Sequence, residues 1–386
     1  MKLRHPLRSA RIGVAVLAAA LCAAPAASAA EKFYATTPEN TLISFTSQAP
    51  NRILDSEPIN GLLANETIVG MDTRPATGQL YALTSTGRIL IINRSSGDTK
   101  FVAGPLAIVG TTFGFDFNPV ADAIRITSDT EQNFRYRLSD GTVFVDGPLA
   151  YGAGDAGAGS NPTIGAAAYT NSVFGAAAPA TTTLLAIDSA RDTLVSVSPP
   201  NVGTLTTVGS LGLDATELVH YDIAADQTGY AAFSSPSFTG VRLYSINQTT
   251  GTASIAAASP RIGRSGTITS LTAVGQVTDD VKGPAVAVGN YSIDRSLWLS
   301  RGVTFTLSCA EDCISVVTLR VGTRVVGTTT VTLEAAGTKV ARIALTSFGR
   351  RVIAAADGRV ATSLTFSNRD FANQRRVQVA RFVSID

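Results

Sequence analysis

The sequence has 386 residues, of which 45% are hydrophobic, which is too long for one ordinary core and enough for two domains. Its formal net charge of +2 hides an uneven distribution: residues 31–284 carry 14 Lys and Arg against 22 Asp and Glu, whereas residues 285–386 carry 13 against 7. Beyond residue 30 the only histidine is His220. That excludes metal sites built from several imidazoles and leaves one possible member for a Ser-His-Asp triad.

The first thirty residues have the composition of a secretory signal. A basic start precedes an apolar run over residues 12–24, and small residues end the segment at Ala30. The run is too short to span a bilayer, and Leu21 stands where a lipoprotein signal ahead of Cys22 would need a small residue. We therefore expect cleavage after Ala29 or Ala30, no membrane span, and a secreted, extracellular protein.

Between residues 31 and 275 the chain repeats a pattern of four short strands. Clear copies begin at Ile68, Thr112 and Leu218, and a weaker copy begins at Ile164. Each copy has an apolar first strand, a turn, a second strand, a looser tip, an alternating third strand and a glycine turn into a fourth. Four strands in a repeat of about forty to fifty residues predict the blades of an all-β propeller.

The two ends of this region complete one more blade. The segment from Ile268 offers only a first strand, and residues 33–59 offer a second, third and fourth strand. Pairing of these segments would close the ring and leave no exposed sheet edge. We predict a five-bladed propeller, with a six-bladed ring as the alternative if the glycine-rich middle hides another blade.

Three strings in this region resemble a known family: GFDFNPVADAIRITSDTEQNFR, VDGPLAYGAGDAGAGSNPTIGAAAYTN and RDTLVSVSPPNVGTLTTVGSLG. On these strings, residues 31–275 are similar to the secreted bacterial domains grouped as domain of unknown function 4394. The resemblance implies a propeller fold and export, and it brings no catalytic residue.

After residues 276–284, a predicted linker, short strands alternate apolar and polar residues through 285–386. About one hundred residues with this half-buried pattern predict a small antiparallel β-sandwich, which looks like the immunoglobulin-like modules of exported bacterial proteins. We expect Trp298 in its core. Because exported proteins meet oxidising conditions, we also expect a disulfide between Cys309 and Cys313.

The net positive charge of residues 285–386 either keeps the protein soluble or binds an anionic partner. An exported protein would meet a polyanionic cell envelope rather than nucleic acid, and aromatic residues for base stacking are sparse in this part of the chain. We therefore predict no nucleic-acid binding and, if there is a partner, the anionic envelope.

Polar residues concentrate in the tip between two strands of the repeat that begins at Thr112 and in the glycine-rich loop that follows that repeat. Both segments are expected on the same face of the ring, and long loops in compact domains are often functional. The candidate ligand-binding residues are Asp129, Glu131, Gln132, Asn133, Arg135, Asp155 and Asn161.

Three interpretations of this group remain open. The first is a satisfied polar network in which Arg135 pairs with Asp129 or Glu131. The second is a site for a small polar ligand or a glycan. The third is hydrolysis of a glycosidic bond with Glu131 and Asp155 as acid and base. Calcium held by Asp129, Asp155 and Asn161 is a further alternative; otherwise no metal or cofactor is predicted.

Three aspartates end the first strands of their repeats, at Asp72, Asp116 and Asp222. We expect them to accept local backbone N–H groups in turns, because each blade needs its own turn and only one needs chemistry. His220 is expected to line the central channel. The sequence thus predicts a non-enzymatic binding protein with its contact surface on the face of the polar loops, the alternatives being a glycan-acting hydrolase and a purely structural exoprotein.

Overall fold

The structure is a computed structural model. It describes residues 30–216, 219–263, 266–274, 286–289, 294–309, 313–333, 337–369 and 375–384. Residues 1–29 of the expected signal and the whole expected linker, 276–284, lie outside the described residues.

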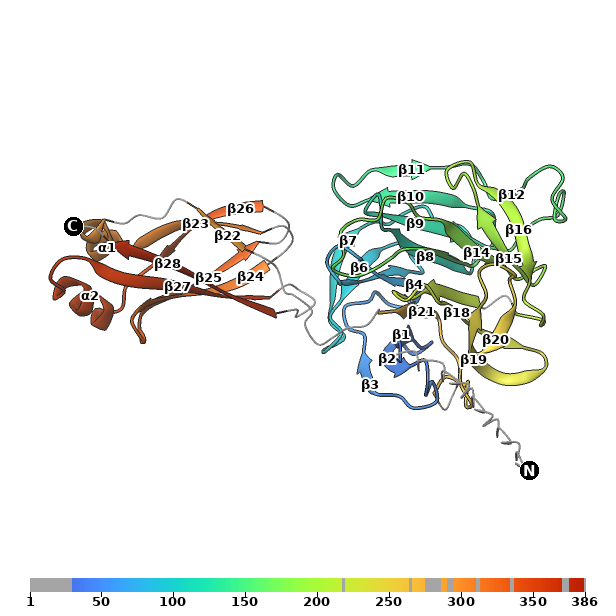
Figure 1. The fold of residues 1–386 in the computed structure, drawn as a ribbon, viewed down its shortest axis with the longest axis horizontal. Helices are drawn as coiled ribbons and strands as arrows, with labels where there is room; N and C mark the ends of the chain where they lie inside the picture. The colour runs from blue at the N-terminus through green and yellow to red at the C-terminus, as the bar shows by residue number, and fades with distance from the viewer. Residues whose placement is uncertain are drawn as a thin grey trace, which may run out of the picture.

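Residues 32–273 form five small sheets that follow one another along the chain (Figure 1). The first sheet has the order β21 (Ser270–Ala273), β1 (Lys32–Thr36), β2 (Thr41–Thr46), β3 (Asp55–Pro58). The second has the order β4 (Ile68–Thr73), β5 (Leu80–Thr84), β6 (Ile89–Ile92), β7 (Thr99–Ala103). The third has the order β11 (Val143–Val145), β10 (Asn133–Arg137), β9 (Ala123–Ser128), β8 (Phe113–Asn118).

The fourth sheet has one extra strand, and its order is β12 (Ala150–Tyr151), β16 (Thr204–Ser210), β15 (Thr193–Val197), β14 (Leu184–Asp188), β13 (Ala166–Tyr169). The fifth sheet has the order β17 (Val219–Ile223), β18 (Gly229–Ser235), β19 (Phe238–Ile246), β20 (Ala253–Ile255). The glycine-rich middle of the chain therefore contributes β12 to the edge of the fourth sheet.

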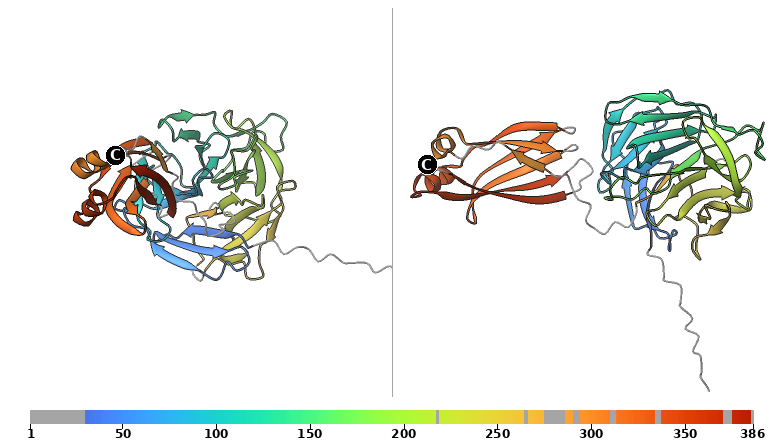
Figure 2. Two further views of the ribbon diagram at one scale, coloured as in Figure 1. Left: turned by 60° about the vertical axis from the view of Figure 1, so that its left-hand side comes forward. Right: turned by 45° about the horizontal axis from the view of Figure 1, so that its top comes forward.

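The two ends of this region pair with one another, as the repeat pattern predicts. Strand β1 runs antiparallel to β21, with Phe33 opposite Ala273 and Thr36 opposite Ser270. The innermost strands of the five sheets, β4, β8, β13, β17 and β21, each pack against the next, and β21 packs against β4 (Figure 2). The result is a closed, propeller-like arrangement around a common axis.

Glycine allows the innermost strands to approach closely. A Cβ atom on Gly114 of β8 would lie 2.8 Å from the backbone nitrogen of Ala167 on β13. Farther from the axis, aromatic side chains fill the space between neighbouring sheets. The ring centres of Phe33 and Tyr230 lie 5.1 Å apart, as do those of Tyr81 and Phe117. Burial between sheets, rather than within one sheet, stabilises the arrangement.

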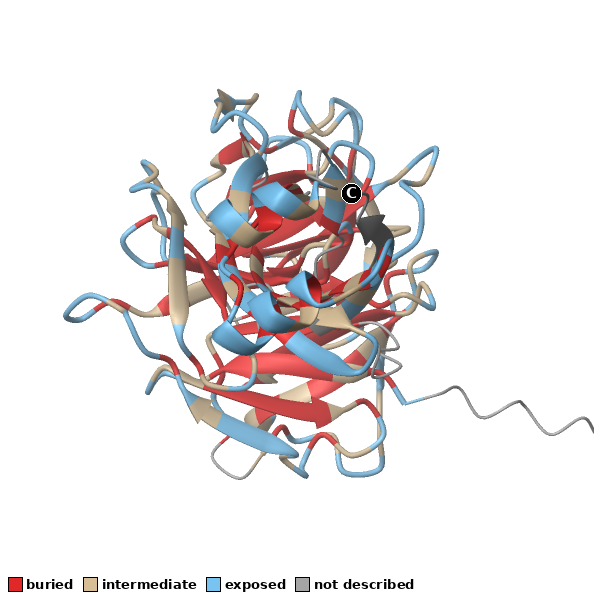
Figure 3. Cartoon of the chain, turned by 90° about the vertical axis from the view of Figure 1, so that its left-hand side faces the viewer, coloured by how far each residue is buried: buried red, intermediate tan, exposed pale blue. Residues whose placement is uncertain are grey.

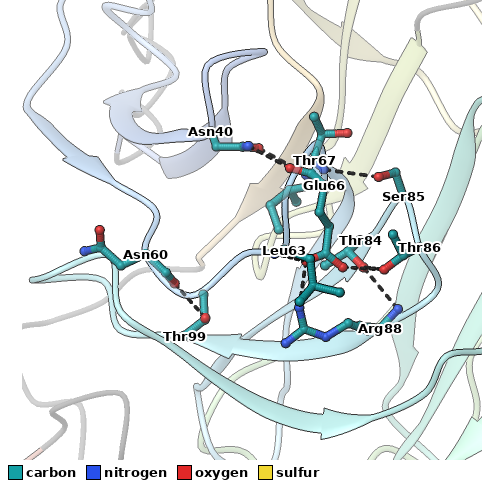
Figure 4. A network of polar contacts seen from close by, with 11 residues as sticks. Asn40, Asn60, Leu63, Glu66, Thr67, Thr84, Ser85, Thr86, Arg88 and Thr99 are labelled. Carbon is teal, nitrogen blue, oxygen red and sulfur yellow. Dashed lines mark hydrogen bonds and ion pairs between the residues drawn. The ribbon is translucent and has the colours of Figure 1, made fainter.

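A polar network ties the first sheet to the second (Figure 4). Glu66, which is 1% exposed, accepts hydrogen bonds from Leu63 N–H at 2.8 Å and from Thr86 Oγ1, and it pairs with Arg88 at 2.7 Å. Its carbonyl accepts a bond from Asn40 of the first sheet at 2.8 Å. These contacts fix the connection between β3 and β4.

Residues 286–384 form two further sheets. One has the order β22 (Val286–Gly289), β23 (Val303–Cys309), β26 (Gly337–Ile343), and the other has the order β25 (Arg324–Leu333), β24 (Cys313–Val321), β27 (Val360–Arg369), β28 (Arg375–Ser384). The described residues contain two short helices, α1 (Arg295–Arg301) and α2 (Ser347–Ala354). The predicted all-β class is therefore confirmed.

The core of this second part includes Trp298, which is 0% exposed, together with Phe305 and Phe366. Trp298 is thus a core residue, as expected, and the predicted disulfide between Cys309 and Cys313 is present. Figure 3 shows that buried residues concentrate in the strands, whereas the two helices and many of the loops are exposed. Within the part of the chain that the structure describes, no helix combines the length and the apolar composition needed to cross a membrane.

Candidate functional site

Three aspartates meet on the axis of the ring. Asp72 of β4, Asp116 of β8 and Asp222 of β17 are all buried, and each offers a carboxylate oxygen within 4.8 Å of the others. They occupy the same position on their strands, and Ala168 of β13 and Thr272 of β21 occupy that position on the other two. Because the innermost strands converge on the axis, side chains at the same position of each strand come close together there. We call these three residues the axial aspartates.

Each axial aspartate is hydrogen-bonded to the next strand of the ring. Asp72 accepts the N–H of Phe117 at 2.8 Å, Asp116 accepts that of Tyr169 at 3.0 Å, and Asp222 accepts that of Ala273 at 2.6 Å. Asp72 and Asp222 also accept the N–H of the residue that follows each of them, both at 2.6 Å. The expected local backbone bond is therefore present at Asp72 and Asp222, and the ring adds to each of the three carboxylates a bond from a neighbouring strand that the sequence analysis did not foresee.

The three carboxylates differ in how fully they are bonded. Thr272 Oγ1 lies 3.1 Å from Asp72 and 2.9 Å from Asp222, and its hydroxyl has one proton to donate. Asp116 accepts only the bond from Tyr169, at Oδ1, and its Oδ2 has no hydrogen-bond partner among the described residues. Because hydrogen bonds to a carboxylate favour its charged form, Asp116 is the member of the group that most readily takes a proton.

Burial dominates the electrostatics of the axial aspartates. It raises the pKa of Asp72 and of Asp116 well above the usual range, and the neighbouring carboxylates raise both further. Burial also raises the pKa of Asp222 to about 6. No ion pair of the described residues includes any of the three. Charge on this group therefore has to be balanced by shared protons or by a cation, and three carboxylates suit a hard cation such as calcium.

Small cavities lie beside the axial aspartates. One of about 20 Å³ is lined by Asp72 and Asp222 and by Phe174 of the long loop between β13 and β14. Another of about 20 Å³ is lined by Gly114 and His220, so His220 does line the channel as expected. Burial lowers the pKa of His220 to about 4. The imidazole is therefore neutral at pH 7 and supplies no positive charge to the aspartates.

The polar tip between β9 and β10 is occupied by bonds to the preceding loop. Asp129 accepts the N–H of Thr111 at 2.9 Å and its Oγ1 at 2.5 Å. Gln132 accepts the N–H of Val109 at 2.9 Å and donates to the carbonyl of Ala107 at 2.8 Å. Both side chains hold residues 107–111 against the tip.

A second group of polar bonds joins the third sheet to the fourth. Asn133 is buried and donates to the carbonyls of Gly147 and Pro200, both at 2.9 Å. Arg135 forms two bonds with Asp146, at 2.7 and 2.8 Å. The expected pairing of Arg135 with Asp129 or Glu131 is therefore wrong, because Asp146 on the next strand connection lies opposite the guanidinium group.

Arg125 is the centre of that second group and was missed by the sequence analysis. It is 1% exposed, pairs with Asp146 at 2.5 Å, and donates to Asn133 and Asn201, both at 2.8 Å. Its signal in the sequence was an arginine between two isoleucines of an apolar strand. A charged residue at such a position needs a buried partner.

The side chains of the remaining predicted residues, Asp155, Asn161 and Glu131, belong to neither of these two groups of polar bonds. Asp155 accepts the N–H of Gly157 at 2.7 Å and both the N–H and the Oγ1 of Thr207, at 2.8 and 2.7 Å. These bonds hold the pKa of Asp155 below its usual value. Asn161 is exposed. Glu131 has a positive φ of 61°, and its Oε1 is buried with no partner among the described residues.

The structure therefore brings most of these residues into two internal networks rather than one open site. Strand β12 pairs in parallel with β16, so the glycine-rich loop passes along the outer strand of the fourth sheet. Asp155 is hydrogen-bonded to Thr207 of β16, whereas the carbonyl of Glu131 accepts the N–H of Leu149 at 3.0 Å. Among the described residues, Glu131 and Asp155 make no hydrogen bond with one another.

These features define an all-β protein with a propeller-like ring of small sheets whose innermost strands are linked by buried carboxylates. The chain belongs to the family described as Domain of unknown function (DUF4394), whose model matches residues 41–272. No sequence match exists among the curated proteins.

The solved structures that match this chain are distant in sequence. PorZ, a surface component of the type-IX secretion system of Porphyromonas gingivalis, is 13% identical with a TM-score of 0.33; the match covers 92% of this chain and 50% of that one. YCF48 bound to D1 peptide is 8% identical with a TM-score of 0.32, and 74% of each chain is covered. The WD40 domain of Toxoplasma gondii coronin is 8% identical with a TM-score of 0.31, covering 89% of this chain and 75% of that one. The chain thus spans half the length of the PorZ structure.

Proposed function

We propose that this chain is an exported, non-enzymatic binding protein, with residues 31–275 forming a five-bladed propeller and residues 285–386 an immunoglobulin-like sandwich. The five sheets in sequence order, with β1 paired to β21, support five blades over six. The observation that carries the binding role is the clamping of adjacent loops at the third sheet. A surface whose loops are fixed before a ligand arrives loses little conformational entropy on binding.

The loops are clamped from both sides. Asp129 and Gln132 hold residues 107–111, and Asn133 holds Gly147 and Pro200. These bonds engage most of the polar groups in the two networks, so those groups are not free to bind a ligand. The side chains left for a ligand are the partly exposed Glu131, the exposed Asn161, and Arg135, whose side chain is 27% exposed. These residues fit a small polar ligand or a glycan.

The hydrolase alternative is less well supported. A glycosidase needs one carboxyl group with a raised pKa as the acid, and a second carboxylate at a defined separation from it. Asp155 accepts three hydrogen bonds that lower its pKa. It is therefore a weak base, which is the role it would take in this mechanism, and hydrogen bonds already occupy both of its oxygens.

The test uses the mature chain on a glycan array and on a panel of glycosides. We expect binding without turnover, and we expect Asn161→Ala and Glu131→Gln to weaken binding at least tenfold. Arg137→Ala is the matched control, because Arg137 lies on the same strand and pairs with Asp140 at 3.1 Å. Turnover that disappears with Glu131→Gln would establish the hydrolase instead, and a chain with neither binding nor turnover would be a structural exoprotein.

A second role is favoured by the surface around α1 and α2. Arg301, Arg324, Arg350 and Arg351 are exposed there. Three apolar side chains are exposed on the same elements: Leu297 at 41%, Val325 at 41% and Phe348 at 38%. Basic residues interleaved with apolar ones suit the surface of an anionic membrane.

Co-sedimentation with vesicles tests this role. We expect the mature chain to bind vesicles with anionic lipid and not vesicles of neutral lipid, with loss at high salt. The double substitution Arg350→Glu and Arg351→Glu should abolish binding, whereas Lys339→Glu with Arg342→Glu, on β26, should reduce it less. Equal retention at low and high salt would refute the electrostatic role.

A further inference from the structure

Glu31 is a buried carboxyl group without a partner at the start of the first sheet. It is 0% exposed, and among the described residues it is the only acidic side chain with both oxygens buried and free of hydrogen bonds. Its backbone is well ordered by Ser47: the N–H of Glu31 donates to Ser47 Oγ at 3.0 Å, and its carbonyl accepts the N–H of Ser47 at 2.8 Å. Glu31 therefore extends the pairing of β1 with β2.

The surroundings of Glu31 make its charge costly. Burial and, to a smaller extent, the negative charge of Asp226 together raise its pKa to about 7. The Tyr230 hydroxyl is the other titratable group that senses this carboxyl. The neighbouring ammonium of Lys32 lies 5.0 Å from the centre of the Tyr34 ring, and no ion pair of the described residues includes Glu31. An unpaired buried carboxylate next to a second acid calls for a cation.

We propose that removal of the leader supplies this cation: hydrolysis of the bond between Ala30 and Glu31 leaves an α-ammonium group on Glu31 beside its own buried carboxylate. A signal peptidase uses water for this step; the hydroxyl group of the water completes the carboxylate of Ala30, and the freed amine is protonated at neutral pH. The inference rests on the proposed export. Cleavage after Ala29 would leave the ammonium on Ala30, whose side chain is exposed.

The position of Glu31 gives the new charge a structural consequence. Strand β1 begins at the next residue, and β1 is the strand that joins β2 to β21 and so closes the ring. In the precursor the buried carboxylate opposes closure, and in the mature chain the ion pair favours it. Export and processing would then precede full stabilisation of the ring, which suits a chain that crosses a membrane unfolded.

N-terminal sequencing of the protein exported by a bacterial host tests the cleavage site. We expect the mature chain to begin at Glu31; a chain that begins at Ala30 overturns the site. Retention of the leader in the cell would count against the proposed export itself, and it leaves the stability test below unaffected.

Thermal unfolding of two purified forms tests the ion pair. One form begins at Glu31 and the other at Ala26, both made by protease removal of a tag, and each is compared with its Glu31→Gln variant. At pH 7.5 we expect the form that begins at Glu31 to melt about 4 °C higher than the extended form, and Glu31→Gln to raise the melting temperature of the extended form only.

The pH dependence distinguishes this pair from a general effect of chain length. In the extended form the folded-state pKa of Glu31 lies above its ordinary 4.5, so stability falls as pH rises from about 4.5 to 7. The gap between the two forms should therefore be small at pH 4.5, open by pH 7.5, and shrink again when the amine loses its proton well above its ordinary pKa of about 8. An equal effect of Glu31→Gln in both forms, or a gap that does not change with pH, overturns the proposal.

Discussion

Replacing Asp116 by Asn tests the electrostatics of the axial aspartates. The carboxylate oxygens of the three residues lie within 4.8 Å of one another. Two unit charges at that separation repel by about 3.5 kcal/mol at an effective dielectric constant of about 20.

Asp116→Asn should remove this cost without breaking the ring. Asp116 accepts one hydrogen bond, from Tyr169, and the single oxygen of Asn can keep it while the amide donates to a neighbouring carboxylate. Because the folded-state pKa of Asp116 is raised, wild-type stability is lost as pH rises from about 4 through that pKa. The variant should match the wild type near pH 4 and exceed it by up to about 3 kcal/mol at pH 8.

The assay is thermal unfolding of both proteins from pH 4 to pH 8 in EDTA, read as the difference in melting temperature so that other titrations cancel. About 2–4 °C is expected for each 1 kcal/mol in a domain of this size. Asp72→Asn is the matched control. Both oxygens of Asp72 accept backbone N–H groups, from Thr73 and Phe117, so the loss of one acceptor costs about 1–3 kcal/mol and offsets the gain.

A difference that does not change with pH, or a variant less stable than the wild type at pH 8 in EDTA, would refute this electrostatic reasoning. A cation in the group gives a different pattern. Millimolar calcium would then raise the melting temperature of the wild type at pH 8 and have less effect on Asp116→Asn, because ligand binding to the folded state stabilises it.

Three further predictions concern stability. Arg125→Met should destabilise the first five sheets by about 3–5 kcal/mol in urea unfolding, because it leaves Asp146 buried with one guanidinium partner instead of two. Reduction of the disulfide between Cys309 and Cys313 should cost about 2 kcal/mol, since the closed loop is short, and should lower only the unfolding transition of residues 285–386. Gly114→Ala should lower the melting temperature by several degrees, because its new Cβ would collide with the backbone of the neighbouring strand β13.

Each of these three predictions has an outcome that would contradict it. An Arg125→Met variant within about 1 kcal/mol of the wild type would show that the buried network adds little. A reduced protein whose first transition moves as much as its second would contradict independent unfolding of the two parts. A Gly114→Ala variant that melts with the wild type would contradict the tight packing of the innermost strands.

The strand pattern of the ring was predictable because it depends on local signals. Alternating apolar residues and glycine turns placed the repeats at Ile68 and Thr112, and both begin strands or immediately precede one in the structure. The joining of the chain ends followed from counting: one strand was left over at Ile268 and three at residues 33–59. The reason is physical, since a leftover strand exposes unpaired backbone groups until its partner is found.

The polar contacts were harder to predict because partners come from distant loops. Arg135 was expected to pair with an acid in its own tip, but the guanidinium group reaches Asp146. Asn133 bonds to Pro200, which lies in the turn between β15 and β16 of the fourth sheet. Sequence spacing identifies donors and acceptors on one strand, but the partner is chosen by which loops the ring places side by side.

The axial aspartates show the same limit of sequence reasoning in a more general form. Taken one repeat at a time, an aspartate at the end of each first strand is a local hydrogen-bond acceptor. Taken around a ring, the same position recurs at the axis, so Asp72, Asp116 and Asp222 share one small volume. At the other two strands the position holds Ala168 and Thr272, neither of which is charged. Five carboxylates there would multiply the repulsion calculated above, so the departures from the repeat limit the charge that the axis must neutralise, and Thr272 adds a hydroxyl donor where two of the carboxylates meet.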